Sequence, residues 1–152
     1  MRFEIGPASV EVNIPDKARL LDEVAARLAG GRGFALATLN VDHLEKLRHD
    51  AAFRRAYGAH DLIVADGNPV VWLARLAGKP LSLVPGSELV VPLCRLAAEA
   101  GRPVAIIAGT EEAGGKAAAA LRAQISGLNV ALIAAPSFPF NPDGAEADAL
   151  LD

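Results

Sequence analysis

Short apolar runs along the chain alternate with longer segments in which apolar residues recur every three or four positions. The runs are continuous, which is typical of strands buried on both faces. Four of them predict strands, over residues 34–40, 62–65, 103–109 and 129–136. The segments with the longer period predict helices, over residues 16–30, 41–60, 68–78, 87–101 and 110–125. This rhythm indicates a mainly parallel sheet covered by helices on both faces.

The first residues follow a different pattern. Apolar and polar residues alternate over residues 8–14, and Gly6-Pro7 marks a turn before them, which predicts a small hairpin. Asp16 and Asn68 suit helix caps, and a break in the second helical segment is expected near Asp50. Residues 137–152 predict a proline-rich loop and the start of a helix. The predicted fold class is therefore α/β, with a Rossmann-like, mainly parallel sheet, helices on both faces and a small N-terminal β-hairpin.

The composition limits the kinds of protein that this chain can be. A chain of 152 residues, 52% hydrophobic and 22% charged, suits one domain over residues 1–152. The net charge of −3 gives no reason to expect nucleic-acid binding. The single cysteine, Cys94, excludes an internal disulfide and fits a core thiol in a reducing compartment. Without a signal peptide or an apolar run of about 18 residues, a soluble, cytoplasmic protein is expected.

Polar residues follow three of the predicted strands, where open parallel sheets bind their ligands. They are Thr38 and Asn40, then Asp66, Gly67 and Asn68, then Gly109, Thr110 and Glu111. If the strands share one sheet, these corners converge on one rim. Each group also has a simpler interpretation. Asn40 and Thr110 can cap helices, Thr38 can bond to its own backbone, and Asp66-Gly67 is a common turn pair.

The sequence lacks the motifs of several other kinds of functional site. No GxGxxG or GxxxxGK[ST] phosphate motif and no G-x-S-x-G elbow is present. The three histidines, His43, His49 and His60, have no metal-site spacing and predict a solvated helix face. Trp72 is expected in the core. No metal is predicted.

Taken together, the motifs resemble those of the WecG/TagA/CpsF glycosyltransferases. The resemblance rests on T-x-N at a strand end, A-D-G before an apolar helix, and G-x-[DE]-L some twenty residues later, here Gly86-Ser87-Glu88-Leu89. The later strand, glycine-rich turn, helix, strand and phenylalanine-containing loop follow in the same order. The resemblance extends from the hairpin to about residue 145.

The resemblance implies a metal-independent, inverting glycosyltransferase of cell-envelope polysaccharide synthesis, peripheral at the cytoplasmic membrane. The implied donor is a UDP-sugar, typically UDP-N-acetylmannosamine, and the implied acceptor is a sugar linked to undecaprenyl diphosphate. Asp66 matches the proposed catalytic base, and Thr38 matches a threonine of the same pocket. Pocket positions are matched by Asn40, Gly67, Asn68, Gly86, Ser87 and Glu88, and the nucleotide side by Gly109, Thr110 and Glu111. Association of copies into a homo-oligomer is left open.

The chain departs from this family at two places. Leu83 stands where the family often has an arginine, so a cation expected near the diphosphate is missing. The family's next strand and its basic C-terminal segment are also expected to be missing after residue 152. These departures leave a second interpretation open, a non-catalytic nucleotide-sugar-binding module of Rossmann-like fold.

Overall fold

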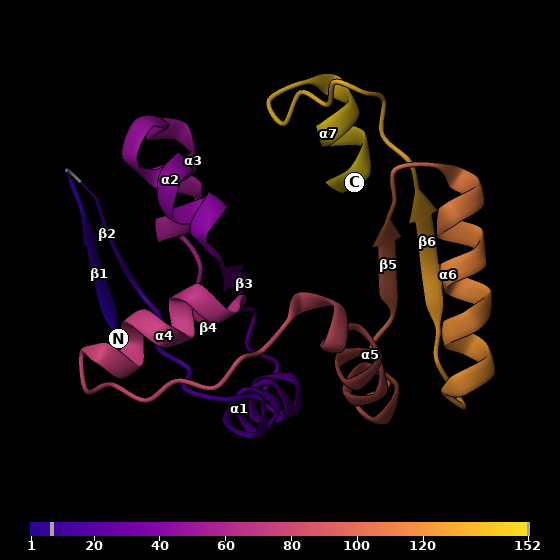
Figure 1. The fold of residues 1–152 in the computed structure, drawn as a ribbon. Helices are drawn as coiled ribbons and strands as arrows, with labels where there is room; N and C mark the ends of the chain where they lie inside the picture. The colour runs from indigo at the N-terminus through magenta and orange to yellow at the C-terminus, as the bar shows by residue number, and fades with distance from the viewer. Residues whose placement is uncertain (7, 152) are drawn as a thin grey trace. The chain divides into compact units, whose positions relative to one another are not determined.

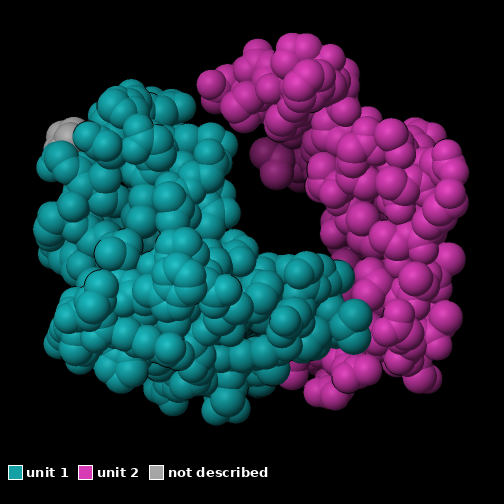
Figure 2. Space-filling model, viewed as in Figure 1, with its two compact units in different colours: residues 1–93 teal, residues 94–152 magenta. Residues whose placement is uncertain are grey.

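A computed structural model describes residues 1–6 and 8–151, apart from the side chain of Ala8. The described chain forms two compact units, residues 1–93 and residues 94–152 (Figures 1 and 2). Each unit contains its own pair of parallel strands. The expectation of a single domain over the whole chain stays a prediction.

Unit 1 begins with the predicted hairpin. Strands β1 (Arg2–Ile5) and β2 (Ala8–Glu11) pair antiparallel, with Phe3 opposite Val10. Both of these side chains are buried, so the alternating pattern does place one face of the hairpin against the core. Helix α1 (Lys17–Ala29) follows, and its cap is the predicted one, because the Asp16 side chain accepts a hydrogen bond from the backbone N–H of Arg19.

The parallel pair of unit 1 is formed by β3 (Leu36–Leu39) and β4 (Leu62–Ala65). Helices α2 (Val41–His49) and α3 (Ala51–Gly58) connect them. The helical segment breaks at Asp50, as predicted, and the Asp50 carboxylate then caps α3 by accepting a hydrogen bond from Phe53 N–H at 2.9 Å. The strand–helix–strand order of the sequence is thus preserved with parallel pairing.

After β4 the structure departs from two expectations. Helix α4 (Asn68–Leu76) begins with Gly67 as its N-cap and without a side-chain cap, so Asn68 is the first helical residue rather than the cap. Trp72 is 58% exposed, not buried, because the buried face of α4 is formed by its smaller residues Val70, Val71 and Ala74. A short 3₁₀ helix, η1 (Gly86–Glu88), follows the extended segment after α4.

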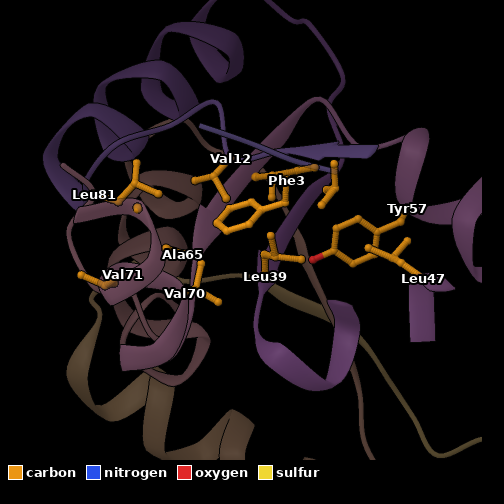
Figure 3. Packing of buried hydrophobic residues seen from close by; sticks show 12 residues of the cluster. Phe3, Val12, Leu39, Leu47, Tyr57, Ala65, Val70, Val71 and Leu81 are labelled. Atoms are coloured by element: carbon orange, nitrogen blue, oxygen red, sulfur yellow. The ribbon is translucent and has the colours of Figure 1, made fainter. Parts of the chain in front are cut away.

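The core of unit 1 joins the hairpin, both strands and α4 (Figure 3). Leu39 and Val70 are fully buried within it, and Phe3 and Val12 reach it from the hairpin side. Burial of this apolar surface is the main force that holds β3 and β4 in register. Since Leu39 and Ala65 are the last residues of their strands, the core fixes the positions at which the two strands end.

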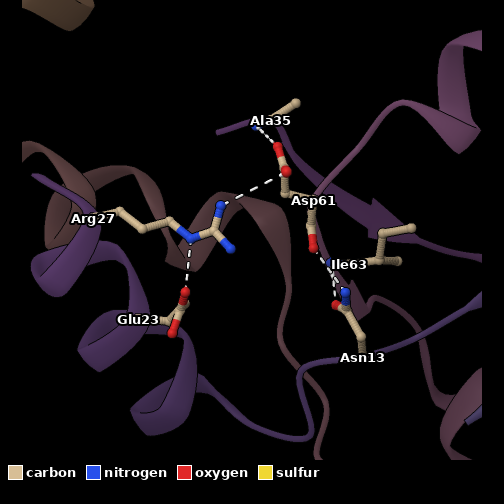
Figure 4. Close-up of polar contacts among 6 residues, drawn as sticks. All are labelled: Asn13, Glu23, Arg27, Ala35, Asp61 and Ile63. Carbon is tan, nitrogen blue, oxygen red and sulfur yellow. Dashed lines mark hydrogen bonds and ion pairs between the residues drawn. The ribbon is translucent and has the colours of Figure 1, made fainter. Parts of the chain in front are cut away.

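A polar network ties the start of β4 to its neighbours (Figure 4). The Asn13 side chain donates to the Asp61 carbonyl at 2.7 Å and accepts from Ile63 N–H at 2.9 Å, so it hydrogen-bonds β4 as a neighbouring strand would. The Asp61 carboxylate accepts from Ala35 N–H at 2.8 Å and lies 3.7 Å from Arg27. These bonds anchor the amino ends of β3 and β4.

Unit 2 contains the second parallel pair, β5 (Val104–Ile107) with β6 (Val130–Ala134). Helix α6 (Glu111–Gln124) packs along this pair (Figure 1), where Gly114 lets the helix approach Ile133 closely. The other helices are α5 (Val90–Glu99), which starts in unit 1, and α7 (Ala145–Leu151), which confirms the helix expected in the tail. Cys94 is buried on α5, and burial raises the pKa of its thiol. The predicted α/β class, with parallel strands, flanking helices and an N-terminal hairpin, is confirmed.

The face of the β5–β6 pair opposite Ile133 borders an apolar groove of about 790 Å³ within unit 2. Ile107 and Leu132 line it from the strands, and Phe138 and Phe140 line it from the loop before α7. That loop is tied to α7 by Ser137, whose hydroxyl and backbone N–H both donate to Glu146. These bonds hold the pKa of the Glu146 carboxyl below its usual value.

Candidate active site

Three of the predicted site residues of unit 1 lie together. Thr38 and Asp66 come from the carboxyl ends of β3 and β4, and Gly86 begins η1. A side-chain carbon placed on Gly86 would lie 3.4 Å from the Thr38 methyl carbon, 3.7 Å from the Thr38 hydroxyl oxygen and 3.8 Å from Asp66 Oδ2. The Thr38 side chain and the Asp66 carboxylate therefore both border the space beside the Gly86 α-carbon.

The backbone explains why these residues meet. Asp66 N–H donates to the Leu39 carbonyl at 2.8 Å, which continues the parallel ladder one step past β4. Val84 N–H donates to the Ala65 carbonyl at 2.8 Å, so the segment before η1 runs beside the end of β4. Gly86 N–H then approaches Asp66 Oδ2 at 3.4 Å, a long hydrogen bond. Asp66 is half-buried and within the described residues makes no other side-chain hydrogen bond, so its second oxygen is free to accept a proton.

Gly67 makes the sharp turn from β4 into α4. Its φ of 107° lies in a region that side-chain-bearing residues rarely adopt. A side chain there would also come within 3.9 Å of the Asn40 β-carbon. Asn40 itself caps α2, accepting from His43 N–H at 2.9 Å, which is the simpler of the two roles the sequence allowed. Asn68 is exposed at the start of α4.

The other residues of the predicted G-x-[DE]-L motif differ in exposure. Ser87 and Glu88 are exposed on η1, and the Glu88 carboxylate lies 3.4 Å from the Lys17 ammonium group. Leu83, at the position where an arginine was expected, is 42% exposed. Leu89 is buried and holds the motif to the body of unit 1. Of this motif, only Gly86 contacts the Thr38–Asp66 pair directly.

The third predicted corner belongs to unit 2. Thr110 follows β5 and caps α6, accepting a hydrogen bond from Ala113 N–H at 3.1 Å, while Gly109 precedes it on the wall of the apolar groove. Glu111 and Glu112 fill the first turn of α6. Their negative charges stabilise the N-terminus of α6 and oppose the binding of an anionic ligand there. The convergence of this corner with the other two stays a prediction.

Two residues that the sequence did not single out, Tyr57 and His43, contact Thr38. The Tyr57 hydroxyl donates to the Thr38 carbonyl at 2.7 Å, and Nδ1 of His43 lies 2.9 Å from the same oxygen. His43 is half-buried between the rings of Phe53 and Tyr57, so its assignment to a solvated helix face was wrong. His49 does lie on that face, exposed and 3.0 Å from Glu45. The spacing of the histidines in the sequence could not show that His43 contacts Thr38, because this contact depends on how α2 and α3 pack.

Burial raises the pKa of the Tyr57 hydroxyl strongly, and the negative charge of Asp66 raises it further. We therefore predict that folded protein resists tyrosinate formation well above pH 10, whereas unfolded protein in denaturant titrates near the ordinary pKa of about 10. Because the unfolded state then loses a proton that the folded state keeps, the free energy of unfolding falls as the pH rises above about 10. Tyr57 is the only tyrosine, so ultraviolet absorbance reports this group alone. Equal titration curves for folded and unfolded protein would contradict the prediction.

Searches among known proteins identify the family. The sequence model of the glycosyl transferase WecG/TagA/CpsF family matches residues 7–151, nearly the whole chain. No curated protein matches the chain significantly. The chain thus belongs to the WecG/TagA/CpsF glycosyl transferases, as the motifs suggested, and the family places it among glycosyltransferases of cell-envelope polysaccharide synthesis.

Among residues 1–6 and 8–151, no group of three or more His, Cys, Asp or Glu side chains is arranged to hold a metal ion. None of the helices in that part of the chain is both long enough and apolar enough to span a membrane.

Proposed function

We propose that the chain transfers a sugar, N-acetylmannosamine in the leading case, from a UDP-activated donor to a sugar on undecaprenyl diphosphate. The observation that supports this is the meeting of Thr38, Asp66 and Gly86 in a chain of this glycosyltransferase family. In this proposal Asp66 is the general base and Thr38 holds a substrate hydroxyl or the departing phosphate.

The proposed chemistry is an inverting displacement at the anomeric carbon. Asp66 removes the proton from the acceptor hydroxyl while the hydroxyl oxygen forms its bond to that carbon. The bond to the UDP oxygen breaks on the opposite face, and UDP leaves with the electron pair. Oδ2 of Asp66 accepts from Gly86 N–H, so in this proposal Oδ1 takes the proton.

The remaining predicted residues have supporting roles in this proposal. Gly67 and Gly86 would allow close approach of the substrate, and we assign Asn40, Asn68, Ser87 and Glu88 to substrate binding beside them. In unit 2 we assign Gly109, Thr110 and Glu111 to the nucleoside, because a carboxylate can bind ribose hydroxyls but repels phosphate. We propose that no metal takes part and that backbone N–H groups stabilise the leaving diphosphate. The acceptor lipid implies that the protein acts peripherally at the inner face of the cytoplasmic membrane.

A direct assay tests this function. Purified protein, incubated with UDP-N-acetylmannosamine and a short-chain lipid-diphosphate N-acetylglucosamine acceptor, is expected to release UDP and form a disaccharide lipid with inverted anomeric configuration. Addition of a chelator should leave the rate unchanged. A rate that vanishes with chelator would contradict the metal-independent mechanism, and retention at the anomeric carbon would contradict Asp66 as a simple base.

The second candidate is a non-catalytic nucleotide-sugar-binding module. Leu83 favours it, because the arginine expected near the diphosphate is absent. Calorimetric binding of the UDP-sugar with no product formed would support this candidate. Replacing Leu83 with arginine then provides a second test, since turnover gained in that variant would show that only the cation was missing.

A further inference from the structure

The Thr38 carbonyl lies at the edge of β3 that faces away from β4. Ala35 and Leu39 turn their carbonyls toward β4, where they accept from Leu62 and Asp66 N–H groups. Because carbonyls alternate in direction along a strand, the carbonyl of Thr38 points to the opposite edge. It therefore needs partners from outside the β3–β4 ladder.

Two side chains from the following helices supply these partners. Tyr57 of α3 donates its hydroxyl hydrogen at 2.7 Å, and His43 of α2 lies with Nδ1 at 2.9 Å from the same oxygen. A carbonyl oxygen has two lone pairs, so it can accept both bonds. An unprotonated Nδ1 would repel the oxygen at this distance, so a hydrogen bond from His43 to this carbonyl requires the ring hydrogen on Nδ1.

The packing of the aromatic rings holds the two donors in place. Tyr57 is only 5% exposed, and its ring centroid lies 5.7 Å from His43 and 5.4 Å from Phe53. His43 in turn lies 5.8 Å from Phe53. The raised pKa of Tyr57 keeps its hydroxyl protonated, so it remains a donor at any pH at which the protein would act. The charge of Asp66 acts on the same hydroxyl, which links this cluster to the candidate base.

We propose that Tyr57 and His43 are positioning residues for the Thr38–Asp66 site: together they clamp the Thr38 carbonyl and so fix the Thr38 hydroxyl opposite the Asp66 carboxylate. This inference rests on the proposed function for its effect on catalysis, but the clamp itself does not. The carbonyl and the hydroxyl belong to one residue at the end of a short strand. The clamped oxygen belongs to the peptide bond between Thr38 and Leu39, so the two hydrogen bonds restrain the backbone that carries the Thr38 hydroxyl.

The first test measures geometry without any activity. The chain contains two threonines, Thr38 and Thr110, so isotope-labelled threonine gives two methyl signals by nuclear magnetic resonance, assigned with Thr110→Ser. In Tyr57→Phe we expect the Thr38 methyl signal to shift or broaden while the Thr110 signal stays in place. An unchanged Thr38 signal in a folded Tyr57→Phe protein would overturn the clamp.

The second test uses turnover. Loss of the Tyr57 hydroxyl in Tyr57→Phe, or of the ring donor in His43→Leu, is expected to lower kcat about 10-fold with little change in KM for the donor sugar, as expected when reacting groups are misplaced slightly. His43→Asn keeps an N–H donor near the Nδ1 position and should restore most of the rate. His49→Leu is the matched control, because it makes the same change on the exposed face of α2, where His49 lies 3.0 Å from Glu45.

The outcomes separate this inference from the proposed function. A fall in kcat for His49→Leu equal to that for His43→Leu, or no fall in either hydrogen-bond variant, would overturn the positioning role. If wild-type protein binds the UDP-sugar but forms no product, the proposed function fails, and the threonine methyl signals still decide whether the clamp exists.

Discussion

Asp66→Asn is expected to lower turnover by about 10²- to 10⁴-fold, the range for loss of a general base. An amide has nearly the shape of a carboxylate but does not take a proton at neutral pH. The amide oxygen can still accept the long hydrogen bond from Gly86 N–H, so the loop that holds Gly86 should keep its position. The fold and the binding of the UDP-sugar are therefore expected to survive while the chemical step is lost.

The measurement is steady-state release of UDP, with donor binding followed separately by calorimetry. Asp42→Asn is the matched control, because it makes the same change on the exposed face of α2, where Asp42 pairs with Lys46. Asp66→Ala should lose turnover as well. Wild-type rates in both Asp66 variants would remove Asp66 as the base and return the role to another group.

Gly114→Ala is expected to destabilise the protein, although alanine is the better helix former. A β-carbon on Gly114 would lie 2.6 Å from the Ile133 side chain and 3.3 Å from Ala108. The first distance is too short for any contact between carbons, and Ile133 is branched at its own β-carbon, so it has little freedom to move. Overpacking of this kind costs about 1–3 kcal/mol, which outweighs a gain in helix propensity of about 1 kcal/mol.

The same substitution at the next residue, Gly115, is expected to have the opposite effect on stability. Gly115 lies on the same helix, but a β-carbon there has no atom within 4 Å. Gly115→Ala should therefore raise the free energy of unfolding by about 0.5–1 kcal/mol. Denaturation followed by circular dichroism compares the two variants directly, since they share one composition. Equal stabilities would show that α6 does not pack against β6 as closely as described.

The order and type of the elements were predictable from the sequence. Continuous apolar runs and helical periods are properties of local segments, and caps such as Asp16 and Asp50 are chosen by the residues beside them. Asn68 and Trp72 were misplaced for related reasons. Gly67 already takes the cap position because its φ favours glycine, and Trp72 lies outside the buried face of α4, which Val70, Val71 and Ala74 form.

The candidate site was predictable only in part. The strand ends placed Thr38 and Asp66 at one edge because parallel neighbours end together. The G-x-[DE]-L motif indicated Gly86, but spacing gave no reason for Gly86 to contact the pair while Ser87 and Glu88 do not. Tyr57 and His43 were missed because their contact with Thr38 follows from the packing of α2 on α3. Such packing has no signature in a single sequence.

The distribution of chromophores has a practical consequence for every unfolding experiment described above. Trp72 and Tyr57 are the sole residues of their kinds, and both belong to residues 1–93. Fluorescence therefore reports on the first half of the chain alone, whereas circular dichroism senses helices in both. Melting curves that coincide by the two methods would show that the halves lose structure in one cooperative step, and curves that separate would give each half its own midpoint.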